Sequence, residues 1–252
     1  MAGSHEKAQE IAFGAIGIGL FLALWEIIGV YRLAGLTWPP LTQVLAFLFD
    51  PSRQALFLRA SGATFSMAAL GYLAGGIAGI GLAALVHMFP VVRPGVDRLS
   101  SVIHAIPAIA LAPIFIVLIN RDFTGMAIAA LNVYFVLYVG TTSGLMNSTQ
   151  NHRDLFTVLG ASKVARFGRL DLPAALPAIV SAMKYAVPAS LIGAILGEWF
   201  GSSRGLGLLM VSAMQNFQIP LLWSAVLIAA GASLAAFGLM TLVERLVYGR
   251  FQ

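Results

Sequence analysis

The chain has 252 residues, of which 59% are hydrophobic and 10% are charged. Soluble domains carry about 45–50% apolar and about 25% charged residues, so this composition cannot cover a water-facing surface. Because the mean hydropathy is also high, at +0.89, we expect one all-α membrane domain over residues 1–252. The net charge is +5, but the charged residues are too few to form a nucleic-acid-binding face. The absence of cysteine excludes disulfides, thiolate metal sites and cysteine nucleophiles.

Six stretches are long and apolar enough to cross about 30 Å of hydrocarbon as helices. In chain order they are Ile11–Val30, Gly62–His87, Leu99–Ile119, Thr124–Met146, Leu176–Gly197 and Leu221–Val243. The first stretch lacks the features of a cleaved signal peptide, so we expect it to be retained. After Trp38-Pro39-Pro40, residues 41–49 predict a short apolar helix that lies in the outer membrane interface.

The distribution of Lys and Arg predicts the orientation in the membrane, because cytoplasmic loops are enriched in these residues. With both termini in the cytoplasm, the inner segments hold nine of them: Lys7, Arg93, Arg98, Arg153, Lys163, Arg166, Arg169, Arg245 and Arg250. The outer segments then hold five: Arg32, Arg53, Arg59, Arg121 and Arg204. This excess predicts a multi-pass protein of the bacterial inner membrane with both termini in the cytoplasm.

Small residues and prolines mark the spans that we expect inside the helix bundle. Gly71, Gly75 and Gly79 recur at four-residue spacing, which lets another helix approach closely, either within the chain or in a dimer. Pro107 and Pro113 interrupt the third span. Bent helices often line transport pathways, although prolines also serve packing alone.

Polar groups inside the later spans each admit more than one interpretation. Asn132 and Tyr134 can hydrogen-bond to a neighbouring helix or contact a solute. Lys184 can extend toward the cytoplasmic headgroups or act at the pathway or a dimer contact. Glu198 can anchor the interface, pair with Arg204 or lie on the pathway. The candidate pathway residues are Pro107, Ala108, Pro113, Asn132, Tyr134 and Glu198.

Motifs for catalysis and nucleotide binding are missing from the sequence. An intramembrane protease needs a nucleophile beside a base, a zinc-binding helix or paired buried aspartates, and the sequence shows none of these arrangements. A phosphate-binding loop ends in Gly-Lys-Ser/Thr, whereas Lys7, Lys163 and Lys184 are followed by Ala, Val and Tyr. We therefore expect no enzymatic activity, no metal site and no cofactor bound by this chain.

The longest polar stretch, residues 147–175, is predicted to lie in the cytoplasm between the fourth and fifth spans. It contains the sequence DLFTVLGASKVARFGRLDLPAALP, which begins at Asp154. We expect a short helix, a sharp turn at Gly160 and a second short helix that begins near Ser162 and ends at Leu172-Pro173. Pro177 should then lie in the first turn of the next span. An apolar surface that the chain itself does not cover indicates a partner.

This loop resembles the EAA loop of ABC importer permeases, which runs acidic-Ala-Ala, three residues, Gly, nine residues, then apolar-x-Leu-Pro. Asp154 stands at the acidic position, Gly160 follows at the expected spacing, and Leu170-Asp171-Leu172-Pro173 closes the motif. Leu155 and Phe156 replace the two alanines. The remainder of the chain resembles the nitrate/sulfonate/taurine-type permeases in three features: the Pro-rich segment before the interfacial helix, the span from Pro107 to Pro113, and the run from Glu198 to Gly207.

The resemblance implies a type I ABC importer. Such an importer has two identical or different permease subunits of about six spans each, two cytoplasmic ATPase subunits that use ATP and Mg²⁺, and an extracytoplasmic solute-binding protein. The implied ATPase-coupling residues are Asp154, Leu155, Phe156, Leu159, Gly160, Ala161, Leu172 and Pro173. Asp154 would cap the first short helix or pair with a basic residue of the ATPase. The resemblance leaves the solute open.

A gradient-driven secondary transporter or channel is the alternative. That class calls for charge relays inside the membrane or inverted repeats, and the sequence shows neither clearly.

Overall fold

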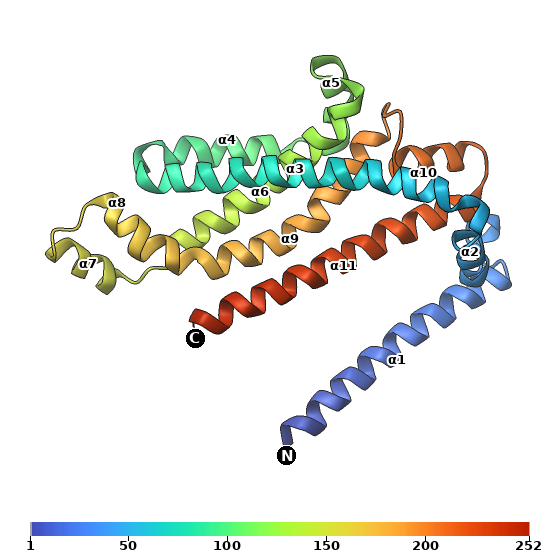
Figure 1. Cartoon of the computed structure of the whole chain (residues 1–252), viewed down its shortest axis with the longest axis horizontal. Coiled ribbons are helices and arrows are strands. Elements are labelled where there is room, and N and C mark those ends of the chain that lie inside the picture. The colour runs from blue at the N-terminus through green and yellow to red at the C-terminus, as the bar shows by residue number, and fades with distance from the viewer. Residues whose placement is uncertain (1, 252) are drawn as a thin grey trace. The chain divides into compact units, whose positions relative to one another are not determined.

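The computed structural model describes the backbone of residues 2–251 and the side chains of Gln9 and residues 12–249. This part of the chain is almost entirely helical and contains no strand. The long helices are α1 (Ala2–Val30), α3 (Gln54–Met88), α6 (Thr124–Leu145), α9 (Leu172–Glu198) and α11 (Ile219–Phe251) (Figure 1). The shorter helices are α2 (Leu41–Leu48), α4 (Arg93–Ala105), α5 (Ala108–Leu118), α7 (Gln150–Val158), α8 (Lys163–Arg166) and α10 (Leu206–Gln215).

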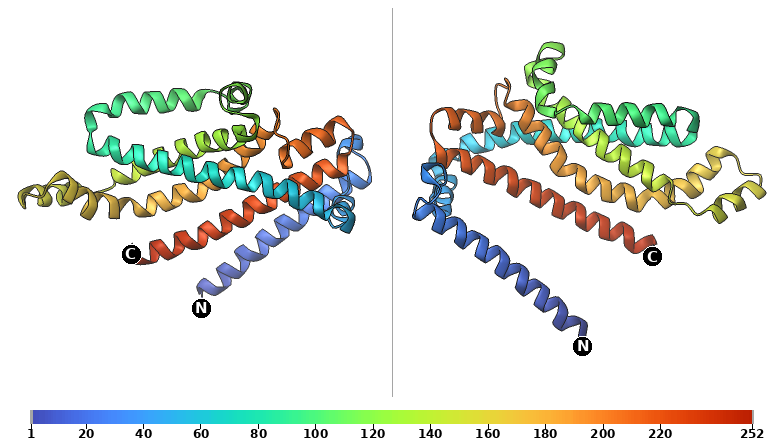
Figure 2. Two further views of the ribbon diagram at one scale, coloured as in Figure 1. Left: turned by 45° about the horizontal axis from the view of Figure 1, so that its top comes forward. Right: turned by 180° about the vertical axis from the view of Figure 1, so that it is seen from behind.

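Five helices of the described part are long and apolar enough to cross a membrane, and α4 with α5 make a sixth crossing if they form one broken span. All six predicted spans are therefore confirmed as helical, as is the short helix after Trp38-Pro39-Pro40, which is α2. The chain turns back after α3, so that α4 runs antiparallel to it (Figure 2).

The third span is broken rather than merely bent. The axes of α4 and α5 differ by 95°, and Figure 1 shows α5 rising away from the line of α4. Ile106 is extended at the break, a conformation that is favoured for the residue before a proline, and α5 starts directly after Pro107. The interruption predicted at Pro107 is thus present, whereas Pro113 lies inside α5 and does not end it.

The contacts divide the chain into two compact units, residues 1–58 with 209–227 and residues 59–208 with 228–252. In the first unit, Glu26 of α1 accepts hydrogen bonds from the backbone N and the hydroxyl of Thr42, at 3.0 and 2.6 Å. The carboxylate thereby caps the N-terminus of α2. The rings of Trp25, Trp38 and Trp223 pack against one another, and Trp25 Nε1 donates to the carbonyl of Pro39 at 3.1 Å.

The helices α6 and α9 make an extensive contact in the second unit and lie side by side in Figures 1 and 2. Glycine makes this approach possible. A Cβ atom on Gly144 would lie 2.9 Å from the Cβ of Ala178, and one on Gly193 would lie 2.6 Å from the Cα of Ala129. Membrane helices associate by such close packing because lipid provides no hydrophobic driving force.

The predicted stripe of glycines on α3 also packs within the chain. A Cβ on Gly71 would lie 2.5 Å from the Cβ of Ala129, and one on Gly79 would lie 2.6 Å from the carbonyl oxygen of Tyr134. Both neighbours belong to α6. The carbonyl oxygen of Tyr134 is part of the α6 backbone and cannot move aside as a flexible side chain can. A larger residue at Gly79 would therefore push α3 away from α6.

Candidate functional site

The loop between the fourth and fifth spans has the predicted helix, turn and helix start. Gly160 follows α7 with a φ of +69°, a left-handed conformation that favours glycine. The hydroxyl of Ser162 then accepts a hydrogen bond from the backbone N of Ala165 at 3.2 Å and so caps α8.

The predicted end of the second helix at Leu172-Pro173 is wrong. The chain passes from α8 through a π-helical segment, Phe167–Asp171, directly into α9, so residues 163–198 form one continuous helical run. Pro173 lies in the first turn of α9, and Pro177 lies inside the helix rather than in its first turn. Pro173 is at the start of α9, where proline is tolerated because its missing N–H has little cost there.

Apolar side chains of α7 point away from the rest of the chain. Leu155 is 51% exposed and Leu159 is 71% exposed, whereas Phe156 is half-buried. Asp154 lies within α7 and accepts a hydrogen bond from Gln150 Nε2 at 2.8 Å, so it does not cap this helix. An exposed apolar surface of this kind is typical of an interaction site.

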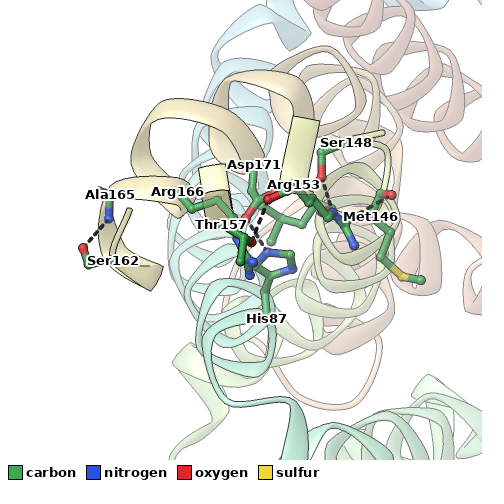
Figure 3. A network of polar contacts seen from close by, with 10 residues as sticks. His87, Met146, Ser148, Arg153, Thr157, Ser162, Ala165, Arg166 and Asp171 are labelled. Carbon is green, nitrogen blue, oxygen red and sulfur yellow. Dashed lines mark hydrogen bonds and ion pairs between the residues drawn. The ribbon is translucent and has the colours of Figure 1, made fainter. Parts of the chain in front are cut away.

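A polar network that we did not predict lies behind α7 (Figure 3). At its centre is Asp171, which is 1% exposed. Its Oδ1 accepts a hydrogen bond from the hydroxyl of Ser148 at 2.9 Å, and its Oδ2 lies 3.0 Å from Nε2 of His87. Arg166 Nε lies 3.5 Å from the same Oδ2.

Arg153 connects α7 to this network (Figure 3). Its Nε donates to the hydroxyl of Ser148 at 2.7 Å. Its Nη2 donates to the carbonyls of Leu145 and Met146, at 3.5 and 3.3 Å, where a cation stabilises the C-terminal end of α6. We call Asp171, His87, Ser148, Arg153 and Arg166 the Asp171 network. It joins α3, α6, α7 and the π-helical segment before α9.

A cavity of about 140 Å³ lies at the break between α4 and α5, against α6. Four of the predicted pathway residues line it, namely Pro107, Ala108, Asn132 and Tyr134, and Pro113 and Glu198 do not. The polar lining is partly satisfied by the chain itself. The hydroxyls of Ser100 and Tyr134 lie 2.6 Å apart, and Asn132 Nδ2 donates to the carbonyl of Ala189 at 3.4 Å. His104 stacks on Phe135, with ring centroids 3.7 Å apart.

Glu198 is 2% exposed, and its hydrogen bonds are formed with Thr64 and Gly207 rather than with Arg204. Its Oε2 accepts hydrogen bonds from the hydroxyl of Thr64 at 2.9 Å and from the backbone N of Gly207 at 2.7 Å. Its Oε1 is buried and has no hydrogen-bond partner. Thr64 also accepts a hydrogen bond from the backbone N of Leu206, at 2.7 Å. The carboxylate therefore joins the end of α9 to α3 and to the start of α10.

Lys184 pairs with an acidic residue of another helix. Its side chain is 12% exposed, and Nζ lies 2.6 Å from Oε2 of Glu244 on α11. Ser181 donates to the other carboxylate oxygen at 2.6 Å. Helices α9 and α11 are therefore joined by an ion pair that spacing along the chain could not reveal.

Comparison with known proteins decides the family. Residues 54–248 match the family described as "Binding-protein-dependent transport system inner membrane component". The chain belongs to this family of permeases. The match covers more than half of the chain, and the apolar helices of the structure agree with a multi-pass inner-membrane protein.

Three relatives illustrate the similarity of this permease to known ones. It is 29% identical to the formylaminopyrimidine transport permease protein ThiX of Halalkalibacterium halodurans, over 90% of this chain and 91% of that protein. It is 25% identical to the putative aliphatic sulfonates transport permease protein SsuC of Bacillus subtilis, over 90% and 83%. It is 22% identical to the taurine transport system permease protein TauC of Escherichia coli, over 94% and 88%.

These matches confirm the resemblance to type I ABC importer permeases of the nitrate/sulfonate/taurine type. The protein is therefore a permease subunit of an ABC importer, and its relatives are transport permeases rather than enzymes.

Proposed function

We propose that this permease couples the passage of a solute to ATP hydrolysis by a cytoplasmic ATPase, through the outward face of α7 and the turn at Gly160. The observation that carries the proposal is the exposed apolar surface formed by Leu155 and Leu159. Such a surface lowers its free energy when a groove of a partner covers it.

The assembly that we propose has four kinds of part. The whole chain acts as one permease domain with both termini in the cytoplasm, beside a second permease subunit that is identical or different. Cytoplasmic ATPase subunits bind ATP and Mg²⁺, and an extracytoplasmic protein delivers the solute. The remaining coupling residues, Phe156, Ala161, Leu172 and Pro173, hold the shape of the loop, while Asp154 is exposed for pairing with a basic residue of the ATPase.

We further propose that the cavity at the break between α4 and α5 belongs to the solute pathway. Pro107 creates the cavity by ending α4, and Asn132 and Tyr134 provide polar groups within it. Binding sites of transporters often lie at broken helices, because the break exposes backbone polar groups to the solute. Glu198 is buried and does not line this cavity, so we do not include it in the pathway that we propose.

The coupling proposal is tested by replacing Leu159 with Asp. A charge in the apolar contact would remain unpaired, so we expect the ATPase to dissociate when the importer is purified in detergent. Leu33→Asp is the matched control, because Leu33 lies outside this loop and is also 71% exposed. The measurement is the ratio of ATPase to permease on a denaturing gel.

Retention of the ATPase at its normal ratio by Leu159→Asp would contradict the proposed contact. Solute uptake by the permease alone in proteoliposomes, driven by an ion gradient, would instead support the gradient-driven alternative.

A further inference from the structure

The Asp171 network lies on the side of α7 opposite its exposed apolar surface. Leu155 and Leu159 point outward, whereas Arg153 points into the network and toward the end of α6 (Figure 3). One short helix therefore presents one face for a partner and attaches by the other face to the membrane-spanning helices.

Two features of the loop make this attachment necessary. Gly160 permits a sharp turn after α7, and the π-helical segment Phe167–Asp171 interrupts the regular hydrogen bonding of the run into α9. The turn at Gly160 is a place where a displaced α7 can rotate relative to the helical run of residues 163–198. Side-chain contacts between α7 and the long helices transmit its displacement without passing through this turn.

Asp171 supplies those contacts. A buried carboxylate needs polar partners to offset the loss of water. The carboxylate of Asp171 is in contact with Ser148 in the linker after α6, His87 at the end of α3 and Arg166 of α8. Ser148 in turn accepts from Arg153 of α7. Buried ion pairs add little net stability, and breaking one is costly, so their main consequence is to hold one fixed geometry.

We propose that Asp171 is the positioning residue of the coupling loop. Its carboxylate holds α7 and α8 to the ends of α3 and α6, so that a displacement of α7 moves α3, α6 and α9 as one body. This inference rests on the proposed function of α7, and it adds the residue that connects the ATPase contact to the membrane-spanning helices.

The experiment follows the movement of the spans without requiring the solute. The natural chain has no cysteine, so Ala108→Cys, at the α4–α5 break, gives this subunit a single thiol. A fluorescent maleimide is the probe, and its rate of reaction is measured in the assembled importer with and without ATP, Mg²⁺ and vanadate. We expect trapping of the ATPase to change this rate.

In the Asp171→Asn variant of the same protein, we expect the ATPase to remain bound and to hydrolyse ATP, while the ratio of the two labelling rates becomes close to unity. Asn keeps the shape of the side chain but removes the charge that holds Arg166 and His87. Ser148→Ala, which removes the link to Arg153 with little risk to folding, should reduce the ratio in the same direction. Ser66→Ala is the matched control, because Ser66 donates only to a carbonyl within its own helix.

The outcomes are distinct. Variants that bind ATPase and keep the full change in labelling rate would overturn the role of Asp171. An unaltered importer that binds no ATPase, or shows no change on trapping, would contradict the proposed function itself. If Asp171→Asn fails to fold, the result with Ser148→Ala decides the proposal by the same criterion.

Discussion

The helical run of residues 163–198 carries a buried acid near each end, and the two acids are compensated in different ways. Asp171, at the end near α7, lies beside His87 and Arg166, which come from other helices. Glu198, at the end near α10, accepts only from the neutral donors Thr64 and Gly207 and keeps one oxygen unpaired. A carboxylate that contacts a cation such as Arg166 depends on its charge, whereas one that contacts only neutral donors depends mainly on the position of its acceptor oxygen.

The largest effect on stability should follow from removing the acid that depends on charge. Asp171→Ala would remove the buried carboxylate that Ser148, His87 and Arg166 contact, and we expect a loss of about 3 kcal/mol, because hydrogen bonds to a charged group contribute about 1.5–3 kcal/mol. We expect a marked fall in the midpoint of thermal unfolding of the detergent-purified permease. Asp122→Ala, a substitution of an exposed acid, serves as the control. Equal midpoints for the two variants would show that the Asp171 network does not hold the structure together.

An intermediate effect should follow at the other end from Thr64→Val. Val keeps the shape of Thr but leaves both Glu198 Oε2 and the backbone N of Leu206 short of one partner. Loss of a partner by a buried polar group costs about 1–3 kcal/mol. The same thermal unfolding measurement applies, with Thr157→Val on exposed α7 as the control. A stability unchanged by Thr64→Val would mean that α10 is held in place by its apolar contacts alone.

The smallest effect should follow from Glu198→Gln, and this variant tests the comparison most directly. Gln preserves an acceptor oxygen for Thr64 and Gly207 while removing the negative charge. We expect a change within about 1 kcal/mol, since the hydrogen bonds are kept and less desolvation of charge is needed. The corresponding Asp171→Asn variant should be clearly less stable. If Glu198→Gln were instead less stable than Asp171→Asn, the proposed distinction between the two acids would be refuted.

Features that depend on local sequence could be predicted, and those that depend on pairing between distant segments could not. Hydropathy and length predicted the six spans, Pro107 predicted the break, and Gly160 predicted the turn after α7. Backbone geometry follows directly from these residue types. The continuation of the helix through Pro173 was missed, because a proline often ends a helix and nothing in the local sequence indicated the π-helical segment that leads into α9.

The partners of the buried charges were missed for another reason. Lys184 and Glu244 are 60 positions apart in the chain, and Asp171 and His87 are 84 apart. Helical periodicity describes one face of one helix, so it does not say which helix lies opposite. One signal was present: an acid between two leucines, as at Asp171, is unusual at the start of an apolar span and marks a side chain that needs a buried partner.

The π-helical segment Phe167–Asp171 sets the rotational phase of everything beyond it. Each residue of a regular helix advances the chain by about 100° around its axis, so deleting one residue there would turn α9 by that angle. Gly193 would then face away from Ala129 of α6. The π-helical segment thus decides which face of the 27-residue helix α9 packs against α6.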